Sequence, residues 1–470
     1  MEGAATTAEL EAIRTETKKA VRLEQKAAWQ GVRTALDGER DTAVELLKAV
    51  PNGMESAEAL ASMTDPIRRD VHVAVRRLLH ATAGEVSEPR TALRRWLEVQ
   101  QTRCGKLFGG QLHVAGEFDA LEVAPVEPEF DQGEEVDGRI VLRENFNALF
   151  EKHPELLTFG EDTGRIGGVN QSMEGMQEAF GKDRVADTGI RECTIIGQGI
   201  GLAMRGLRPI AEIQYLDYLY YALQIMRDDL ATVHYRSAGT QRAPLIVRTR
   251  GHRLEGIWHA GSPMGAIVHS LRGMHVCVPR NMTEAAGMYN TLMSAGEPAL
   301  VVECLNGYRS KERLPSNLGE FKVPLGIPEV VRKGNDLTVV SYGSTFNLCV
   351  QAAKTLSEFD VEVELIDVRT LLPFDLNGTI ADSVSRTHRV LFVDEDVPGG
   401  ASAYMMERSL STGELWQHLD AAPETLSAAP HLPAYGTDGD YFSKPSHEDI
   451  VEKAYAMVAE GDPSSYPDLI

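Results

Sequence analysis

The chain has 470 residues, of which 43% are hydrophobic and 25% charged, a composition typical of a globular protein with two or three domains rather than one hydrophobic core. Its 47 basic and 69 acidic residues give a formal net charge of −22, which argues against nucleic acid or an anionic membrane surface as the main partner. No apolar run reaches membrane-spanning length, and the N-terminal residues lack the apolar segment of a secretory signal, so we expect a cytoplasmic protein. The five cysteines form no CxxC pair, so we expect neither a disulfide framework nor a zinc site.

The first 123 residues predict a charged helical arm. Residues 8–29 are rich in Ala, Glu, Lys and Arg, and Thr64-Asp65-Pro66 is a favourable helix start because proline is tolerated in the first turn. Apolar residues follow at helical spacing, and Ser87 opens another short helix. These helices carry too few apolar residues to enclose a binding site, so we expect an arm that packs on another surface.

An acidic, proline-bearing linker at residues 124–138 leads to residues 139–324, in which helical and strand-like segments alternate. Strands are predicted at residues 156–162, 208–214, 244–249, 274–278 and 299–302, and helices at residues 139–150, 192–204 and 217–235. Residues 325–470 repeat the pattern, with strands at 336–342, 363–368 and 389–394 and a helix at 346–359. The expected fold class is α/β, with two parallel-sheet α/β domains preceded by a helical arm.

Polar side chains follow three of the predicted strands. These are Glu161 and Asp162 after the first strand, Gln214, Tyr215 and Tyr218 after the second, and His252, Trp258 and His259 after the third. Since open α/β sheets bind ligands at the carboxyl ends of their strands, we expect these side chains at one edge of one domain. Simpler interpretations stay open, because the acidic pair could cap the next segment and the tyrosines could be core or interface residues. A histidine in a glycine-bearing loop, however, does not fill a core.

Glu192 stands in the first turn of the predicted helix at residues 192–204, which is rich in small residues. A carboxylate there either complements the helix dipole or meets a buried nitrogen heterocycle, and the residues alone leave both interpretations open. Cys193 beside it fits a small buried apolar residue better than a reactive thiol.

Several common catalytic motifs are absent from the chain. It contains no GxxxxGK[ST] phosphate loop, no HExxH and no GxSxG. The glycines of GQGIGLAMRG lie inside a predicted helix, which disfavours a dinucleotide fingerprint. There is also no Gly-Asp-Gly followed at a distance by Asn, the pattern that would hold magnesium and a diphosphate.

Five segments occur in the order and at the spacing of a known family. They are FGEDTG (159–164), DTGIRE with GIGLAMRGLRPIAEIQYLDY (187–218), GIWHAGSP (256–263), ELIDVRTLLPFD (364–375) and VDEDVPGG (393–400). From about residue 139 to the C-terminus the chain resembles the beta subunit of the decarboxylating component of 2-oxoacid dehydrogenase complexes, which uses thiamine diphosphate. The resemblance implies a pyrimidine-binding domain at residues 139–324 and a transketolase C-terminal-like domain at residues 325–470.

In that family the alpha subunit binds magnesium and the diphosphate, while the beta subunit binds the aminopyrimidine ring. The resemblance implies that Glu192 is the pyrimidine glutamate and that Gln214 and Tyr218 lie near the ring. It also implies that His259 is the active-site histidine and that Glu161 belongs to a proton path between two active sites. A buried carboxyl stays protonated near neutrality and can donate to the ring nitrogen.

The activity implied is oxidative decarboxylation of a 2-oxoacid, branched-chain or pyruvate, with acyl transfer to a lipoyl arm. The implied partners are an alpha subunit, in an alpha2-beta2 heterotetramer, and a lipoyl acyltransferase core. The arm departs from the usual beta subunit, because residues 8–29 are similar to the helical tail of alpha subunits in alpha–beta fused relatives. The chain could therefore be one half of such a fusion made separately. Ala260-Gly261 also stand where many members have Ser-Gln.

Two further interpretations stay open. One is a non-catalytic assembly subunit that docks onto the acyltransferase core. The other is a transketolase-like enzyme half acting on a sugar phosphate, for which Arg250 and Arg253 could line the entrance.

Overall fold

The computed structural model describes residues 5–131, 134–251, 259, 261–412, 415–467 and 469. The chain divides into two compact units, residues 1–110 and residues 111–470. In the described part of the chain, no helix combines the length and the apolar character needed to cross a membrane.

The first unit is helical, as the sequence predicts. It consists of α1 (Thr7–Ala49), α2 (Met54–Ala61), α3 (Arg68–Ala81) and α4 (Glu88–Gly109). The helix at Ser87 is not short: it runs for 22 residues, with the Ser87 hydroxyl accepting from the amide of Arg90. A small core of leucines, valines and alanines holds the four helices together, and buried Glu39 accepts from Arg68 at 2.6 Å and Arg103 at 2.9 Å.

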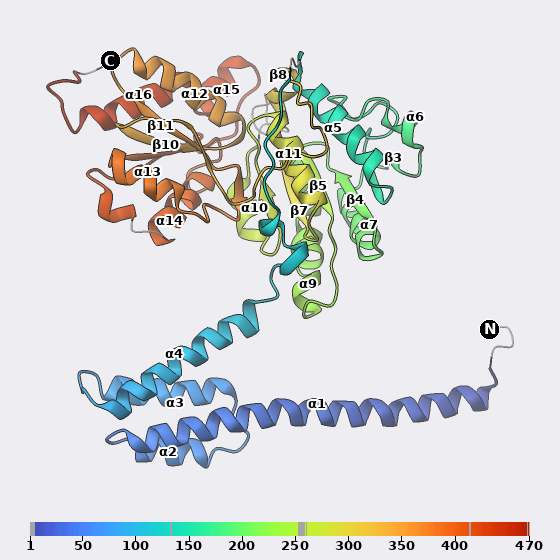
Figure 1. The fold of residues 1–470 in the computed structure, drawn as a ribbon, viewed down its shortest axis with the longest axis vertical. Helices are drawn as coiled ribbons and strands as arrows, with labels where there is room; N and C mark the ends of the chain where they lie inside the picture. The colour runs from blue at the N-terminus through green and yellow to red at the C-terminus, as the bar shows by residue number, and fades with distance from the viewer. Residues whose placement is uncertain are drawn as a thin grey trace. The chain divides into compact units, whose positions relative to one another are not determined.

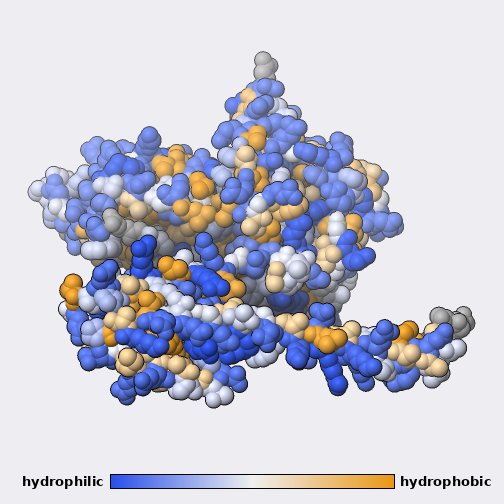
Figure 2. Space-filling view, turned by 60° about the horizontal axis from the view of Figure 1, so that its bottom comes forward, coloured by the Kyte–Doolittle hydropathy of each residue, from blue (hydrophilic) through white to orange (hydrophobic). Residues whose placement is uncertain are grey.

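The N-terminal half of α1 extends past the other three helices of its unit (Figure 1). A capping box between Thr6 and Glu9 starts the helix, and residues 7–32 are exposed. Figure 2 shows this part of α1 as mostly hydrophilic with separate hydrophobic residues. The large apolar side chains exposed along this part of α1 include Leu23 and Trp29, which are 69% and 64% exposed.

The second unit contains a seven-stranded sheet in the order β12-β6-β7-β5-β4-β2-β3. Its strands are β2 (Leu156–Gly160), β3 (Val185–Asp187), β4 (Arg208–Glu212), β5 (Ile246–Gly251), β6 (His275–Cys277), β7 (Ala299–Cys304) and β12 (Thr370–Leu372). All pairs are parallel except β12 with β6, so the predicted parallel sheet is present. Strands β5 and β7 are buried along their whole length, which is why each begins with an apolar run, at residues 246–247 and 299–302.

Helices cover both faces of this sheet. They are α5 (Gly138–Lys152), α6 (Met176–Phe180), α7 (Glu192–Met204), α8 (Tyr220–Ile225), α9 (Val233–Arg236), α10 (Met264–Ser270) and α11 (Met282–Met293). Residues of α5 and α11 pack with Ile210 and Ile246 on one face. Residues of α7, α8 and α10 pack with Ala211 and Val247 on the other. A separate two-stranded ribbon pairs β1 (Glu135–Asp137) with β8 (Lys311–Arg313).

A second α/β sheet follows, as predicted, with the strand order β14-β13-β10-β11-β9. Its strands are β9 (Glu329–Arg332), β10 (Leu337–Ser341), β11 (Val363–Asp367), β13 (Val390–Val393) and β14 (Glu424–Leu426). Its helices are α12 (Gly343–Ser357), α13 (Thr379–Thr387), α14 (Ala401–Thr412), α15 (Thr437–Ser443) and α16 (His447–Ala459). Only the edge strand β9 is antiparallel to its neighbour.

The single helix predicted at residues 217–235 is wrong. The segment is a 3-10 turn at Leu216–Leu219, then α8, a π turn at Met226–Leu230 and α9. The buried residues explain the change of pitch: they are three apart at 216, 219 and 222 and four apart at 222, 226 and 230. A tight turn followed by a wide turn keeps all of them on the core side.

Residues 111–123, which the sequence groups with the arm, belong to the second unit. The carboxylate of Glu297 accepts hydrogen bonds from the amides of Val114 at 3.1 Å and Ala120 at 2.9 Å. It is also 3.2 Å from His113 Nδ1 and 2.8 Å from His275 Nε2. Burial by itself would raise the pKa of Glu297. These hydrogen bonds have the larger effect and hold the pKa below its ordinary value.

Candidate functional site

Strands β2, β4, β5 and β7 lie side by side and end at the same edge of the larger sheet. Their register sets Gly160 beside Glu212, Glu212 beside Arg248, and Arg250 beside Glu303. Charged side chains therefore lie at neighbouring strand ends, close to where the chain continues from β2 to Glu161 and from β4 to Gln214.

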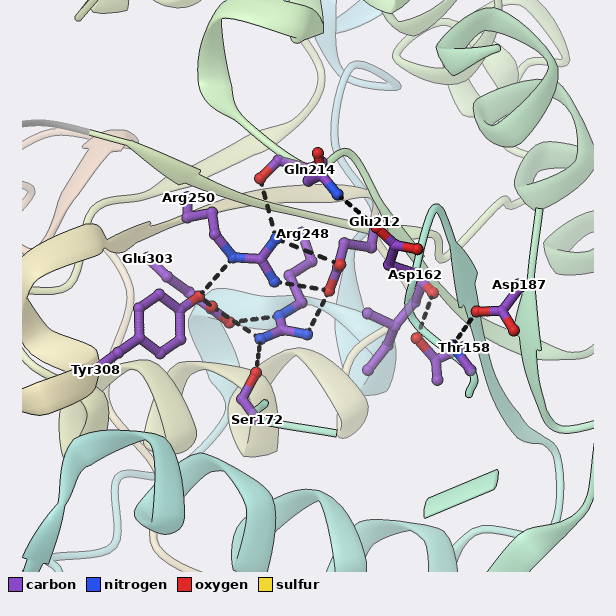
Figure 3. Close-up of polar contacts among 12 residues, drawn as sticks. Thr158, Asp162, Ser172, Asp187, Glu212, Gln214, Arg248, Arg250, Glu303 and Tyr308 are labelled. Atoms are coloured by element: carbon purple, nitrogen blue, oxygen red, sulfur yellow. Dashed lines mark hydrogen bonds and ion pairs between the residues drawn. The ribbon is translucent and has the colours of Figure 1, made fainter. Parts of the chain in front are cut away.

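These strand ends form a fully buried charged network (Figure 3). Arg248 contacts Glu212 at 2.6 Å and Glu303 at 2.7 Å, and Arg250 contacts Glu212 at 3.1 Å. All four side chains are 0% exposed. Two positive and two negative charges balance, which is the condition under which charges are tolerated away from water. Tyr308 and Tyr289 donate to Glu303.

Sequence reasoning missed this network. The signal was present in the apolar strand PLIVRTR, which carries two arginines. Buried arginines require carboxylate partners, and the glutamates that end the neighbouring predicted strands could have been proposed as those partners.

The network holds the loop after β4. Nη1 of Arg250 donates to the main-chain carbonyl of Gln214 at 3.0 Å, and the Gln214 side-chain amide donates to Asp162 at 3.2 Å (Figure 3). Asp162 has a φ of 59°, in the left-handed region, and its carbonyl accepts from the amide of Gly168 at 2.7 Å. The loops after β2 and β4 are thus fastened to each other and to the buried layer below.

Glu192 is the first residue of α7, as predicted, and its side chain is half-buried. Within the part of the chain that the structure describes, its carboxylate forms no hydrogen bond or ion pair. Burial, then the charge of Asp162 and then that of Glu192, raise the pKa of Glu161 above its ordinary value. Neighbouring carboxylates whose charges repel one another favour a bound proton or a hydrogen-bonding ligand.

Three aromatic side chains complete the edge. The His259 ring stacks on Tyr215 with 4.5 Å between centroids and 22° between planes, and it meets Tyr218 edge-on at 5.3 Å. The Tyr218 phenol oxygen lies 3.4 Å from His259 Nε2, while His259 Nδ1 is buried and has no partner among the described residues. Burial and then the charge of Glu161 raise the pKa of Tyr218, so the phenol keeps its proton at neutral pH.

The structure brings the residues selected from the sequence together at one edge of the sheet. Glu161, Glu192 and Tyr218 interact electrostatically, and Tyr218 also contacts His259. Gln214 joins them through Asp162. Such an edge can hold a nitrogen heterocycle and exchange protons with it.

The other residues that the sequence analysis considered are not shown to belong to this group. Cys193 is exposed, contrary to the expectation of burial, because the first turn of α7 presents it away from the core. Arg250 is 1% exposed and paired with Glu212, so it does not line an entrance as a sugar-phosphate ligand would require. His252, Arg253 and Trp258 lie outside the described residues.

The models of two protein families match the chain. Residues 134–310 match the transketolase pyrimidine binding domain, and residues 326–441 match the transketolase C-terminal domain. These ranges correspond to the two α/β layers of the second unit.

Named relatives cover the same region. The chain is 33% identical over 325 residues to the pyruvate dehydrogenase E1 component subunit beta of Staphylococcus epidermidis, which spans 67% of this chain and 97% of that protein. It is 32% identical over 314 residues to the 2-oxoisovalerate dehydrogenase subunit beta of Bacillus subtilis, spanning 66% and 94%. Among solved structures, a split gene transketolase described as an inactive beta4 tetramer has a TM-score of 0.53 at 18% identity, covering 69% of this chain and 98% of that chain, which shows the shared fold.

Proposed function

The chain belongs to the family of 2-oxoacid dehydrogenase beta subunits, and from that membership we propose that it acts in the oxidative decarboxylation of a 2-oxoacid, branched-chain or pyruvate, with acyl transfer to a lipoyl arm. The observation that carries the proposal is Glu192, a half-buried carboxylate without a partner in the described part of the chain, at the start of a helix beside Glu161 and Tyr218.

The residues at this edge fit the aminopyrimidine half of thiamine diphosphate. The Glu192 carboxyl, which has no partner among the described residues, can hold a proton and donate it to a ring nitrogen, and Gln214, whose side-chain amide donates to Asp162, offers an amide group at the same edge. When bound, thiamine diphosphate supplies a nucleophilic carbon and an electron sink for decarboxylation. The sequence carries no Gly-Asp-Gly…Asn motif for magnesium and the diphosphate, so we assign those to an alpha subunit.

Each remaining residue takes a proton-handling or orienting role in this proposal. His259 can exchange a proton with the substrate or hydrogen-bond its carboxylate, while the stack on Tyr215 and the edge contact with Tyr218 fix the imidazole plane. Glu161, whose raised pKa favours a bound proton, can pass that proton toward Glu192. Arg250 acts indirectly by holding the Gln214 main chain.

We propose an alpha2-beta2 heterotetramer that serves a lipoyl acyltransferase core, on the basis of the family.

The five cysteines are all free thiols, which suits the reducing cytoplasm.

The decisive experiment pairs the chain with an alpha subunit and measures 2-oxoacid decarboxylation with a dye acceptor. Glu192→Gln should keep the fold, by circular dichroism, and lower kcat by at least about 100-fold, since it removes the exchangeable proton. Glu178→Gln, which changes an exposed glutamate in the first turn of α6, serves as the control. Near-normal turnover by Glu192→Gln would overturn the assignment.

A further inference from the structure

A cavity of about 440 Å³ lies at the edge of the larger sheet opposite to Glu192. It opens where α7 ends and β4 begins, and it reaches the segment that precedes β5. Phe118, Met204 and Pro244 contribute apolar walls. Arg208 and Arg242 contribute the charged groups.

These two arginines lack neutralising partners. Among the residues that the structure describes, no carboxylate lies within 4.0 Å of either guanidinium. Burial lowers the pKa of Arg208 to about 10; Glu155 opposes this shift, and the positive charge of Arg242 adds to it. Arg208 therefore remains protonated at neutral pH and is repelled by the charge of Arg242. This contrasts with Arg248 and Arg250, each of which is paired with a glutamate.

Both guanidinium groups are held in place by neutral contacts. Nη2 of Arg208 donates to the main-chain carbonyl of Leu292 at 2.6 Å. Arg242 stacks on Phe118, with its Cζ 3.6 Å from the ring centroid. A Cβ at Gly296 would come within 2.9 Å of Arg242 Nη1, so the glycine leaves the room that this guanidinium occupies. Positive charge is therefore presented to the cavity in a fixed arrangement, which lowers the entropic cost of binding.

Capping of α7 does not explain the pair. The carbonyls of Leu202 and Ala203 at the end of that helix already accept main-chain hydrogen bonds from Leu207 at 3.2 Å and Gly206 at 3.1 Å. The arginines are thus available to an external acceptor.

We propose that this cavity binds a small organic anion that carries a phosphate or a pair of carboxylates. Arginine is the side chain best suited to both groups, because its planar fork donates two parallel hydrogen bonds. The apolar walls and the Phe118 ring fit the carbon part of such a molecule, and the volume is that of an ordinary small-molecule site. The site is distinct from the edge that carries Glu192, since it lies at the other end of α7 and β4.

The test titrates the full chain with inorganic phosphate and, separately, with succinate, and follows thermal unfolding and calorimetric heat. Sodium chloride at matched ionic strength is the reference. We expect one of the two probes to bind saturably; tighter phosphate binding identifies an organic phosphate as the ligand class, and tighter succinate binding a dicarboxylate. Arg242→Gln should weaken that binding at least tenfold. Arg227→Gln, which removes the same charge from an exposed position, should leave it unchanged.

Arg242→Glu keeps the proposal testable if the glutamine variant folds poorly. Its carboxylate would give Arg208 an ion-pair partner, so the variant should unfold at a higher temperature than the wild type without anion and should lose the response to phosphate and succinate. The proposal is overturned if neither probe exceeds chloride at equal ionic strength. Equal binding by the wild type and either Arg242 variant would overturn it as well.

Discussion

The fully buried guanidinium of Arg250 donates to the main-chain carbonyl of Gln214 at 3.0 Å. The same guanidinium is paired with Glu212, which in turn is paired with Arg248. The buried charged network inside the sheet therefore positions the main chain of a residue of the candidate site. The contact connects the stability of the fold to the geometry of the site.

Arg250→Met should destabilise the protein, because it leaves Glu212 with one cation instead of two and removes the bond to Gln214. Breaking a buried ion pair from one side typically costs about 3–5 kcal/mol. Urea unfolding followed by circular dichroism measures the change. The double variant Arg250→Met/Glu212→Gln should recover part of the loss, whereas Arg227→Gln at the surface should change stability by less than about 0.5 kcal/mol. Equal stability of wild type and Arg250→Met would contradict the role given to the network.

Tyr218→Phe should lower kcat/KM for the 2-oxoacid by about tenfold, because it removes the hydroxyl that lies 3.4 Å from His259 Nε2. His259→Asn should cost more, about 100-fold or greater, if the imidazole transfers a proton. Steady-state kinetics with the alpha subunit present provide the measurement. Tyr221→Phe, a change at a residue that is 73% exposed, is the matched control. A loss of the same size in that control would remove the specific role of Tyr218.

Glu284 makes the stability of the fold dependent on pH. It is buried, contacts Arg280 at 2.8 Å and Arg369 at 3.1 Å, and shares these cations with Asp367 and Glu329. Burial, followed by the charge of Asp367, raises the pKa of Glu284 from 4.5 to about 8 against the pull of the two arginines.

Because the folded-state pKa is raised, the contribution of Glu284 to the unfolding free energy is complete below pH 4.5 and is lost as the pH rises through about 8. Glu284→Gln stays neutral throughout, so its stability relative to the wild type should increase across this window, by up to about 1.4 kcal/mol per pH unit. Urea unfolding at pH 5, 6.5 and 8 tests the slope. The control Glu320→Gln, at an exposed residue, should give an unfolding free energy that changes with pH as that of the wild type does. The same pH dependence for Glu284→Gln and the wild type would contradict the prediction.

Two glycines of α7 should respond in opposite directions to alanine. A Cβ at Gly199 would lie 2.7 and 2.8 Å from the methyl carbons of Leu245, so Gly199→Ala should destabilise the chain by about 1–2 kcal/mol through overpacking. A Cβ at Gly201 meets nothing within 4 Å, so Gly201→Ala should stabilise it by up to about 1 kcal/mol through helix propensity. Thermal unfolding of the chain alone compares them. Stabilisation by both would show that Leu245 moves aside freely.

Much of this protein follows from its sequence. The apolar runs and their turn residues predict both parallel sheets, the small-residue helix at Glu192 and the common edge of Glu161, Gln214 and Tyr218, because strand periodicity and the placement of ligands at strand ends are local or topological properties. The broken helix at residues 216–236 was not predictable in the same way, since its pitch follows the core on which it packs.

Only the tertiary structure decided which charges are paired. Arg248 and Glu303 are 55 residues apart in the chain but lie on adjacent strands, where the loss of water makes each depend on the other. Among the residues that the structure describes, the same folding leaves Arg208 and Arg242 without a carboxylate within 4.0 Å. A sequence specifies charges and local periodicity, whereas desolvation and partner choice arise from non-local packing, so the buried network and the cationic cavity emerge only once the sheet has formed.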